Sequence, residues 1–306
     1  MSHNLEIKSL KGVHMFSGSI VAIVTPFTPN GDIDNKALGN IIEKHIAAGT
    51  SAIVPCGTTG EAPVLTTEEH RFVIGRCVDI SAGRIPVIAG IGSNSTRQSV
   101  EMTSHAKRCK CDAVMAVTPY YNKPTQSGCI AHFTAIADVG LPLVLYNHPG
   151  RTGTKLTTDT IVKLAKHKNI VAIKEATADV STAMDIIHNS NITVLCGDDN
   201  LVIPFMSVGA SGIISVVANI IPEVWATMVH DYKNGKTDKA LATSYLYRDL
   251  CNAIFSENNP QGIKYAMSLL GICSPSVRLP LVESSATSKE LMHAALANLK
   301  MLNSQQ

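Results

Sequence analysis

Short apolar runs alternate with longer amphipathic segments along most of the chain, and few folds accommodate this pattern. Turn residues flank each apolar run, which is typical of strands that are buried on both faces of a parallel sheet. The expected strands are Ile20–Thr25, Ala52–Pro55, Pro86–Ala89, Ala113–Thr118, Leu143–Tyr146, Ile170–Lys174, Thr193–Cys196 and Gly212–Val216. Helical segments are expected between them, including Asn35–Ala48, Thr67–Ser81, Thr96–Cys109, Gly128–Val139 and Thr158–His167. Strands and helices that alternate in this way indicate an α/β fold.

The number and size of these units favour one fold of that class. Eight strand–helix units of roughly 25–30 residues match a (β/α)8 TIM barrel, which typically needs about 250 residues. After about residue 235 the strand pattern stops, and helical segments are expected at 236–255, 260–271 and 288–302. We therefore predict an N-terminal extension outside the fold at residues 1–14, a barrel at 15–235 and C-terminal helices at 236–306. A doubly wound parallel sheet is the alternative, because periodicity alone does not distinguish the two folds.

Composition excludes several classes of function. The net charge is +2, with 26 Lys and Arg against 24 Asp and Glu. This balance does not indicate electrostatic binding to nucleic acid or to an anionic membrane. No run approaches the roughly 18–20 apolar residues of a membrane span, and the N-terminus lacks the apolar core of a signal peptide. The eight cysteines and eleven histidines show no metal-site or redox spacing. We therefore expect a cytoplasmic protein with reduced thiols and without a metal or cofactor.

Lys174 raises the question of function, because it closes the buried run Ile170–Ile173. One interpretation is that the strand has ended and the ammonium group simply reaches water. In a barrel, however, the loops after the C-terminal ends of all strands meet at one face, where active sites lie. A lysine that burial keeps neutral adds to a ketone and forms a Schiff base. Tyr146, at the end of the preceding expected strand, would be placed to carry the protons of such a reaction.

Two other loops at this face carry groups that suit carboxylates. The GTTG segment at 57–60 supplies two hydroxyls and consecutive backbone N–H groups, although an ordinary glycine-rich barrel loop has the same composition. Arg151 lies five residues after Tyr146. Its guanidinium would either hold a carboxylate at two points or lie free on the surface. GTTG lacks the lysine and spacing of a P-loop, and GIGSNS at 90–95 lacks the last glycine of a dinucleotide fingerprint.

Four motifs in this order and spacing resemble those of the dihydrodipicolinate synthases (4-hydroxy-tetrahydrodipicolinate synthases), within the pyruvate-dependent class I aldolase family. The motifs are GTTGE at 57–61, TPYYNKP at 118–124, YNHPGRTG at 146–153 and KEAT at 174–177. The resemblance extends from Met15 to about Pro280. It implies a (β/α)8 barrel with a Schiff-base lysine.

The resemblance also implies roles for individual residues. Lys174 would form the imine with pyruvate, and Tyr146 would move protons to and from that adduct. Thr58 and Tyr121 would complete a hydroxyl relay, in which the equivalent of Tyr121 reaches in from a neighbouring subunit of a homotetramer. Further residues of the site would be Thr59 and the backbone of Ile214 as pyruvate contacts, Gly197 close to the lysine, and Arg151.

The implied reaction joins pyruvate to L-aspartate 4-semialdehyde and gives 4-hydroxy-tetrahydrodipicolinate for diaminopimelate and lysine biosynthesis. Arg151 would bind the carboxylate of the semialdehyde. The alternatives within the family are N-acetylneuraminate lyase and the 2-keto-3-deoxy-sugar-acid aldolases, whose polyhydroxylated aldehydes need neutral partners at this position. A non-catalytic barrel that binds keto acids or regulates transcription is a further alternative, because barrels host many functions.

Feedback inhibition by L-lysine, the end product of that pathway, is a last implication of the resemblance. Residues that match the inhibitor pocket of lysine-sensitive relatives are Pro63, His70, Asn94 and Tyr120. The same residues would equally serve to pack an interface between subunits. Gln98 departs from the pattern, since sensitive bacterial enzymes carry a glutamate there that faces an ammonium group of lysine. We therefore expect weak inhibition, because an amide lacks the charge assistance of a carboxylate.

Overall fold

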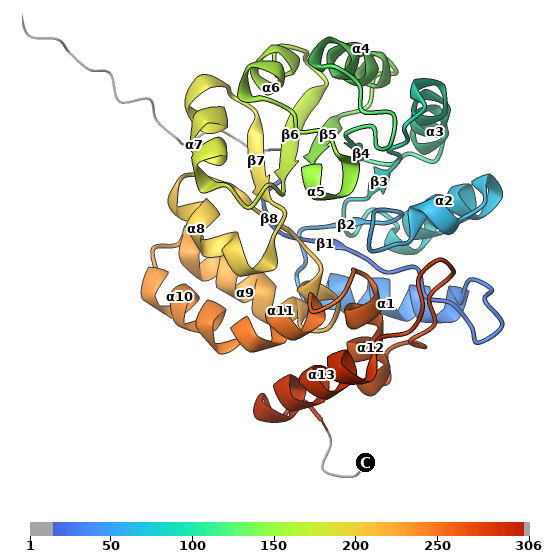
Figure 1. Cartoon of the computed structure of the whole chain (residues 1–306), viewed down its shortest axis with the longest axis vertical. Helices are drawn as coiled ribbons and strands as arrows, with labels where there is room; N and C mark the ends of the chain where they lie inside the picture. Colours follow the sequence, from blue (N-terminus) through green and yellow to red (C-terminus); the bar gives the residue numbers. More distant parts are fainter. Residues whose placement is uncertain (1–14, 303–306) are drawn as a thin grey trace, which may run out of the picture.

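The computed structural model describes residues 15–302, in which eight parallel strands form a barrel surrounded by helices (Figure 1). The strands are β1 (Gly18–Ala22), β2 (Ala52–Val54), β3 (Ile88–Gly90), β4 (Ala113–Val117), β5 (Leu143–Asn147), β6 (Ile170–Glu175), β7 (Thr193–Cys196) and β8 (Gly212–Ser215). Their order is β2-β1-β8-β7-β6-β5-β4-β3, and a parallel bridge between Ile53 and Val87 closes the ring. The predicted (β/α)8 barrel is confirmed, because a doubly wound sheet would stay open. The expected extension at residues 1–14 lies outside the described residues.

The helices of the barrel alternate with the strands. They are α1 (Asn35–Ala47), α2 (Thr67–Ser81), α3 (Thr96–Arg108), α4 (Gln126–Ala137), α6 (Thr158–Leu164), α7 (Val180–Asn189), α8 (Val202–Ser207) and α9 (Pro222–Lys233). Single helical turns lie in four of the loops, at η1 (Ala62–Val64), α5 (Pro149–Thr152), η2 (Asp199–Leu201) and η3 (Val217–Asn219). Side chains fix several helix starts: Thr66 and Glu69 form a reciprocal capping box at α2, and Ser95 and Thr157 cap α3 and α6.

The first strand ends earlier than the sequence pattern predicted, at Ala22 rather than at Thr25. Val24 donates its backbone N–H to the Asn219 side chain, at 3.2 Å, and not to a neighbouring strand. The hydroxyl of Thr25 donates to the carbonyl of Gly60 at 2.7 Å. The chain therefore leaves the sheet after β1, and Thr25 supports the GTTG loop instead of extending the barrel wall.

Side chains of the strands alternate between the inside of the barrel and the layer under the helices. The buried cluster inside the barrel comprises Phe16, Ile20, Ala22, Ala52, Val54, Ile88, Ala113, Met115, Val144, Tyr146, Ala172, Leu195 and Ile214. Lys174 follows Ala172 by two residues on β6, so it shares this inward face. A second, larger cluster packs the outer face of the strands against the helices. The barrel is therefore filled with side chains, and its polar groups collect at the C-terminal end.

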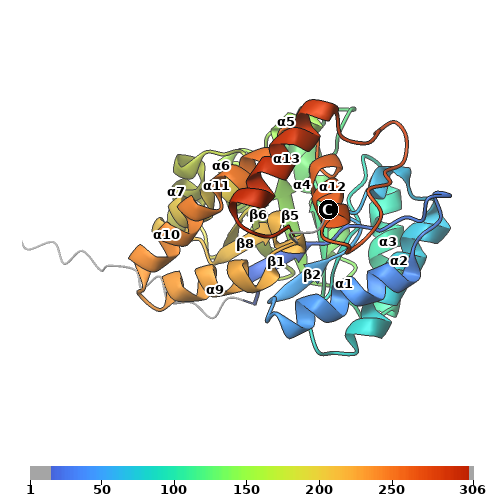
Figure 2. The same cartoon turned by 90° about the horizontal axis from the view of Figure 1, so that it is seen from below.

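After α9 the chain forms four helices where the sequence predicted three. They are α10 (Thr237–Leu246), α11 (Arg248–Ile254), α12 (Gln261–Leu269) and α13 (Ala286–Asn298). The helix expected at 236–255 is interrupted at Tyr247, whose ring packs edge-on against Trp225 of α9 with 5.9 Å between the ring centres. Figure 2 shows α11, α12 and α13 in front of the strands, so this extension covers one side of the barrel. Within residues 15–302, the helices are too short or too polar to cross a membrane.

Candidate active site

Lys174 and Tyr146 lie side by side at the C-terminal ends of β6 and β5. They are paired in the strand register, and the Nζ atom of Lys174 is 4.5 Å from the centre of the Tyr146 ring. The two residues are 4% and 5% exposed. A buried amine in contact with a phenol provides the two groups that Schiff-base chemistry requires, a nucleophile and a carrier of protons.

A cavity of about 570 Å³ reaches Tyr146 from the outside. Thr58 and Arg151 also line it, so a molecule bound there would meet a phenol, a hydroxyl and a guanidinium together. Asn259 and Leu281 of the C-terminal extension complete the wall. Both the size of the cavity and its small number of convergent polar groups are typical of a site for small molecules.

The loop after β2 presents the two threonines on a strained backbone. Cys56 and Glu61, at its two ends, have φ angles of 55° and 53°, in the left-handed region that disfavours residues with a Cβ atom. Gly60 is required between them, because a Cβ atom there would lie 2.8 Å from the backbone nitrogen of Cys56. Thr59 is buried, and its Oγ1 atom accepts a hydrogen bond from Asn259 Nδ2 at 2.9 Å. The hydroxyl of Thr59 is thus held by the C-terminal extension, whereas Thr58 faces the cavity.

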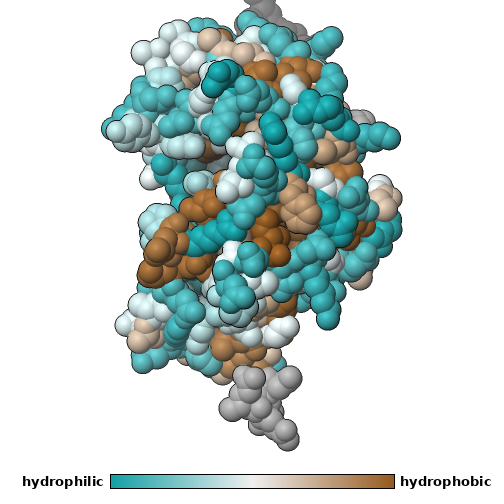
Figure 3. All heavy atoms as spheres, turned by 90° about the vertical axis from the view of Figure 1, so that its right-hand side faces the viewer, coloured by the Kyte–Doolittle hydropathy of each residue, from teal (hydrophilic) through white to brown (hydrophobic). Residues whose placement is uncertain are grey.

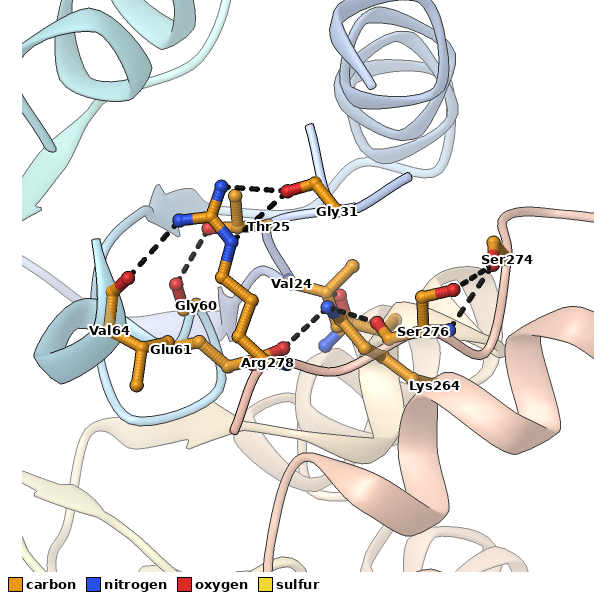
Figure 4. A network of polar contacts seen from close by, with 11 residues as sticks. Val24, Thr25, Gly31, Gly60, Glu61, Val64, Lys264, Ser274, Ser276 and Arg278 are labelled. Carbon is orange, nitrogen blue, oxygen red and sulfur yellow. Dashed lines mark hydrogen bonds and ion pairs between the residues drawn. The ribbon is translucent and has the colours of Figure 1, made fainter. Parts of the chain in front are cut away.

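A buried ion pair joins the same loop to α12 (Figure 4). Lys264 is fully buried, and its Nζ atom donates to Glu61 Oε1 at 2.5 Å and to the carbonyl of Ser276 at 2.9 Å. The second carboxylate oxygen of Glu61 accepts the backbone N–H of Arg278 at 3.0 Å. The Lys264 amine and the Arg278 guanidinium also lie over the ring of Phe27, 4.1 and 4.4 Å from its centre. These contacts fix Glu61, and with it the end of the threonine loop.

Arg151 lies on α5, the single helical turn that follows β5. The turn ends at Gly153 with a φ of 69°, a left-handed conformation that glycine adopts without the steric cost of a Cβ atom. His148 precedes the turn, and its Nδ1 atom is buried without a hydrogen-bond partner. Burial, together with the positive charges of Arg151 and Lys174, lowers the pKa of His148 to about 4. The imidazole is therefore neutral near pH 7, and the cation that this loop offers to the cavity is Arg151.

Five predicted site residues do not line the cavity: Thr59, Lys174, which lies behind Tyr146, and the three described next. Gly197 follows β7, and its N–H donates to the carbonyl of Glu175 at 2.8 Å, next to Lys174. Ile214 is buried inside the barrel on β8. Tyr121 differs from both, because it is 88% exposed and its backbone has a φ of 71°. Tyr121 therefore does not join Tyr146 and Thr58 in the cavity of its own chain.

The residues predicted for lysine binding share the cavity with the catalytic candidates. Those in its wall are Pro63, His70, Gln98 and Tyr120, whereas Asn94 lies outside it. The Nε2 atom of His70 is 2.7 Å from the carbonyl of Gly90, and burial lowers the pKa of this imidazole. Gln98 accepts a hydrogen bond from the hydroxyl of Ser93 at 2.7 Å. Residues of the predicted active site and of the predicted lysine-binding site therefore line the same cavity.

Sequence reasoning missed two residues of this region, Asn259 and Lys264. Asn259 lies in a loop of the C-terminal extension, and no local pattern distinguishes its contact with Thr59. Lys264 left a weak signal, since it adjoins Ile263 on a helix whose other buried residues include Met267. A lysine on the apolar face of a helix needs a buried partner. Within residues 15–302, His, Cys, Asp and Glu side chains form no group of three or more that would hold a metal ion.

Comparison with known proteins agrees with this geometry. The model of the dihydrodipicolinate synthetase family matches residues 15–299. The chain belongs to this family. One relative within the dihydrodipicolinate synthetase family is the 4-hydroxy-tetrahydrodipicolinate synthase of Geotalea daltonii, which is 49% identical over 291 residues that cover 94% of this chain and 100% of that protein.

Solved structures of dihydrodipicolinate synthases have the same fold. The chloride-inhibited enzyme of Acinetobacter baumannii, complexed with pyruvate, has a TM-score of 0.91 and 43% sequence identity, over 94% of this chain and 99% of that one. The DHDPS of Cyanidioschyzon merolae with lysine bound has a TM-score of 0.92 and 36% identity, over 94% of this chain and 100% of that one. The enzyme solved with pyruvate and the one solved with lysine thus both have the architecture described above.

Proposed function

We propose that the protein is a lyase that condenses pyruvate with L-aspartate 4-semialdehyde to 4-hydroxy-tetrahydrodipicolinate, a step of diaminopimelate and lysine biosynthesis. The observation that carries the proposal is the buried contact between Lys174 and the Tyr146 ring, at the face where barrels have their active sites. Membership of the family and the name of the Geotalea daltonii relative support the same reaction.

The proposed chemistry begins at the Nζ atom of Lys174. The amine adds to the ketone carbon of pyruvate, and loss of water leaves an imine. The imine withdraws electrons from the neighbouring methyl group, which releases a proton and becomes an enamine. The enamine carbon attacks the aldehyde carbon of the second substrate, whose oxygen takes up a proton. The amino group of that substrate then attacks the imine carbon, so that Lys174 is released as the ring closes.

The other residues of the site would bind the substrates and move these protons. Tyr146 and Thr58 both line the cavity and would exchange protons with the adduct. Thr59, Gly197 and the backbone of Ile214 would hold pyruvate around the amine. Because Thr59 is positioned through Asn259, the C-terminal extension contributes to the site as well as to the fold.

The proposal is tested by the relative rates of three reactions of the purified protein. We expect condensation of pyruvate with L-aspartate 4-semialdehyde to be faster than cleavage of N-acetylneuraminate or of 2-keto-3-deoxygluconate. Faster cleavage of either sugar acid would make the protein a sugar-acid lyase or aldolase instead. No turnover of any of the three would favour a barrel that only binds keto acids.

Arg151 is the residue that should distinguish the acidic aldehyde from a sugar. We expect Arg151→Ala to raise the KM for L-aspartate 4-semialdehyde, because the substrate carboxylate loses its charged partner. A hydrogen bond to a charged group contributes about 1.5–3 kcal/mol, or roughly a 10- to 150-fold change in affinity. Steady-state kinetics with each substrate varied in turn measure the effect. Arg151→Lys serves as the control, because it keeps the charge without the planar fork. Its KM for the semialdehyde should lie between those of the wild type and Arg151→Ala.

Imine formation with pyruvate should be unchanged in Arg151→Ala, because Lys174 and Tyr146 pair through β5 and β6 and not through α5. A variant that retains the wild-type KM for the semialdehyde, or one that no longer forms the imine, would remove Arg151 from its proposed role.

Tyr121 supports a proposal about assembly, in which this residue completes the relay of a second subunit within a homotetramer. In one chain Tyr121 is 88% exposed and lies outside the cavity wall. The face with α2 and α3 shows apolar side chains among hydrophilic ones (Figure 3), and Phe72 of α2 is 45% exposed. Exposed apolar side chains of this kind suit a contact with another copy of the chain.

We expect Tyr121→Phe to lower kcat by roughly 10²- to 10⁴-fold, the contribution typical of a positioned proton carrier. The unfolding midpoint should stay close to the wild-type value, because phenylalanine keeps the ring and the side chain is exposed within its own chain. Kinetics, thermal unfolding and light scattering of both proteins give the result. A fully active monomer, or an unimpaired Tyr121→Phe enzyme, would contradict the shared site.

Gln98 carries the proposal that L-lysine inhibits the enzyme weakly. The amide oxygen of Gln98 already accepts a hydrogen bond from Ser93 and offers no negative charge to an ammonium group. We expect Gln98→Glu to strengthen inhibition about five- to thirtyfold, which corresponds to roughly 1–2 kcal/mol for the added charge. Titration of both proteins with L-lysine measures this difference, with Gln98→Met as a control that removes the acceptor. Tight inhibition of the wild type, or no gain in Gln98→Glu, would contradict the assignment.

A further inference from the structure

The residues that directly follow the catalytic pair form a second pair on the other face of the barrel wall. Asn147 and Glu175 are partners in the register of β5 and β6, one step beyond Tyr146 and Lys174. Side chains of successive strand residues point to opposite faces, so this second pair lies in the layer outside the barrel. Both residues are completely buried. The wall thus carries a reactive pair on its inner face and a polar pair directly behind it.

Four hydrogen bonds satisfy these buried groups and fix their direction. Asn147 Nδ2 donates to Glu175 Oε2 at 3.0 Å and to the carbonyl of Leu156 at 3.5 Å, and Asn147 Oδ1 accepts the backbone N–H of Leu156 at 3.0 Å. The other carboxylate oxygen of Glu175 accepts the backbone N–H of Thr177 at 2.9 Å. In this arrangement every donor meets an acceptor. A pair of leucines would fill the same volume without the cost of burying polar groups, so packing alone does not explain the pair.

The hydrogen bond from Leu156 also connects this pair to the loop that carries Arg151. Leu156 follows the loop that contains α5 and Arg151, and Asn147 immediately precedes that loop. One amide side chain therefore closes the loop across both of its ends. The backbone carbonyl of Asn147 also accepts the N–H of Ala176 at 3.0 Å, which joins the loop to the end of β6.

We propose that Asn147 and Glu175 are positioning residues that set the place of Tyr146 relative to Lys174 and hold the Arg151 loop against the cavity. The proposal rests on the proposed aldol condensation, since it assigns these residues a role in that reaction. Neither residue touches a substrate. They act through the register of β5 and β6 and through the closure at Leu156.

Exchange of amide and carboxylate provides the test, because the network has a direction. Both partners of the Glu175 carboxylate are donors. In Glu175→Gln the introduced NH2 group therefore faces a donor in either orientation of the amide, Asn147 Nδ2 in one and the N–H of Thr177 in the other. In Asn147→Asp two carboxylates face each other. In the double variant Asn147→Asp/Glu175→Gln the new amide of residue 175 donates to the new carboxylate of residue 147. The bonds from the N–H groups of Leu156 and Thr177 are then kept and the central bond is reversed, so only the long bond from Asn147 Nδ2 to the Leu156 carbonyl is lost.

We expect each single variant to lower kcat/KM for L-aspartate 4-semialdehyde by about 10- to 100-fold, the scale on which a displacement of about 1 Å acts. The double variant should recover most of this loss. Asn169→Asp is the control, because Asn169 is a partly buried amide just before β6, at the opposite end of the barrel, and its Nδ2 atom donates to the carbonyl of Ala137 at 2.8 Å. It should lose stability but keep kcat/KM per folded chain. Wild-type kinetics in the single variants, or no recovery in the double variant, would overturn the proposal.

Crystal structures of the same variants separate this inference from the proposed function. The Arg151 loop and the 4.5 Å contact of Lys174 with Tyr146 should shift in the single variants and return in the double variant. If the wild type does not condense the two substrates, the proposed function fails, and an unmoved loop would then overturn the positioning role independently.

Discussion

We expect Lys174→Arg to lower turnover by about 10⁴-fold or more, the scale on which enzymes respond to the loss of a covalent nucleophile. A guanidinium stays protonated, so it does not add to a ketone. The fold should survive, because the side chain lies at the end of the barrel and the two residues have side chains of similar length. Steady-state kinetics at saturating pyruvate, together with thermal unfolding, measure the two effects.

The matched control is Lys168→Arg, which makes the same exchange at an exposed position just before β6. It should leave kcat and stability unchanged. If Lys174→Arg retained substantial turnover while remaining folded, the proposed lysine chemistry would be wrong, since no other group at this end of β6 would replace the amine.

The largest effect on stability is expected from Lys264→Met. This variant leaves the Glu61 carboxylate buried with only the backbone N–H of Arg278 as a partner at that position. Removal of one member of a buried ion pair costs about 3–5 kcal/mol of the free energy of unfolding. Because Glu61 ends the threonine loop, we also expect turnover to fall before the barrel unfolds. Urea unfolding at a fixed protein concentration and kinetics at each urea concentration measure both effects.

The double variant Glu61→Gln/Lys264→Met tests the cause. It removes both charges, so most of the stability should return if the unpaired carboxylate is responsible. Lys289→Met provides the surface control, because its pair with Glu283 lies at the surface, with the two side chains 33% and 55% exposed, and should contribute about 0–1 kcal/mol. Equal losses in Lys264→Met and Lys289→Met would contradict the assigned importance of the buried pair.

Much of the fold was predictable because barrel strands and helices leave periodic patterns in the sequence. The bounds of β7 and α2 agree with the prediction, since turn residues and a capping box mark them locally. The early end of β1 was not predictable, because it depends on a hydrogen bond from Val24 to Asn219, nearly two hundred residues away. The break at Tyr247 likewise depends on the tertiary contact with Trp225. Local patterns therefore located the elements, and distant contacts set their ends.

The candidate site likewise contains some residues that local patterns predict and others that only distant contacts bring into place. Lys174 and Tyr146 lie at the C-terminal ends of their strands and Thr58 lies in the loop after β2, so the topology of a barrel is enough to bring them to one face. The partners of the threonine loop, Asn259 and Lys264, come from the C-terminal extension, and no periodic pattern relates them to that loop. Asn147 and Glu175 stood next to predicted residues but on the opposite face of the wall. Only the structure shows that they bond each other.

The claim that Lys174 forms a Schiff base with pyruvate is tested most directly by reduction with borohydride in the presence of pyruvate. Reduction converts the imine into a stable secondary amine, and mass spectrometry of the digested protein locates the modified peptide. We predict a pyruvate-derived group on Lys174 in the wild type, and its absence when either pyruvate or borohydride is omitted. An unmodified Lys174 peptide, from protein that condenses the two substrates, would contradict the proposed mechanism.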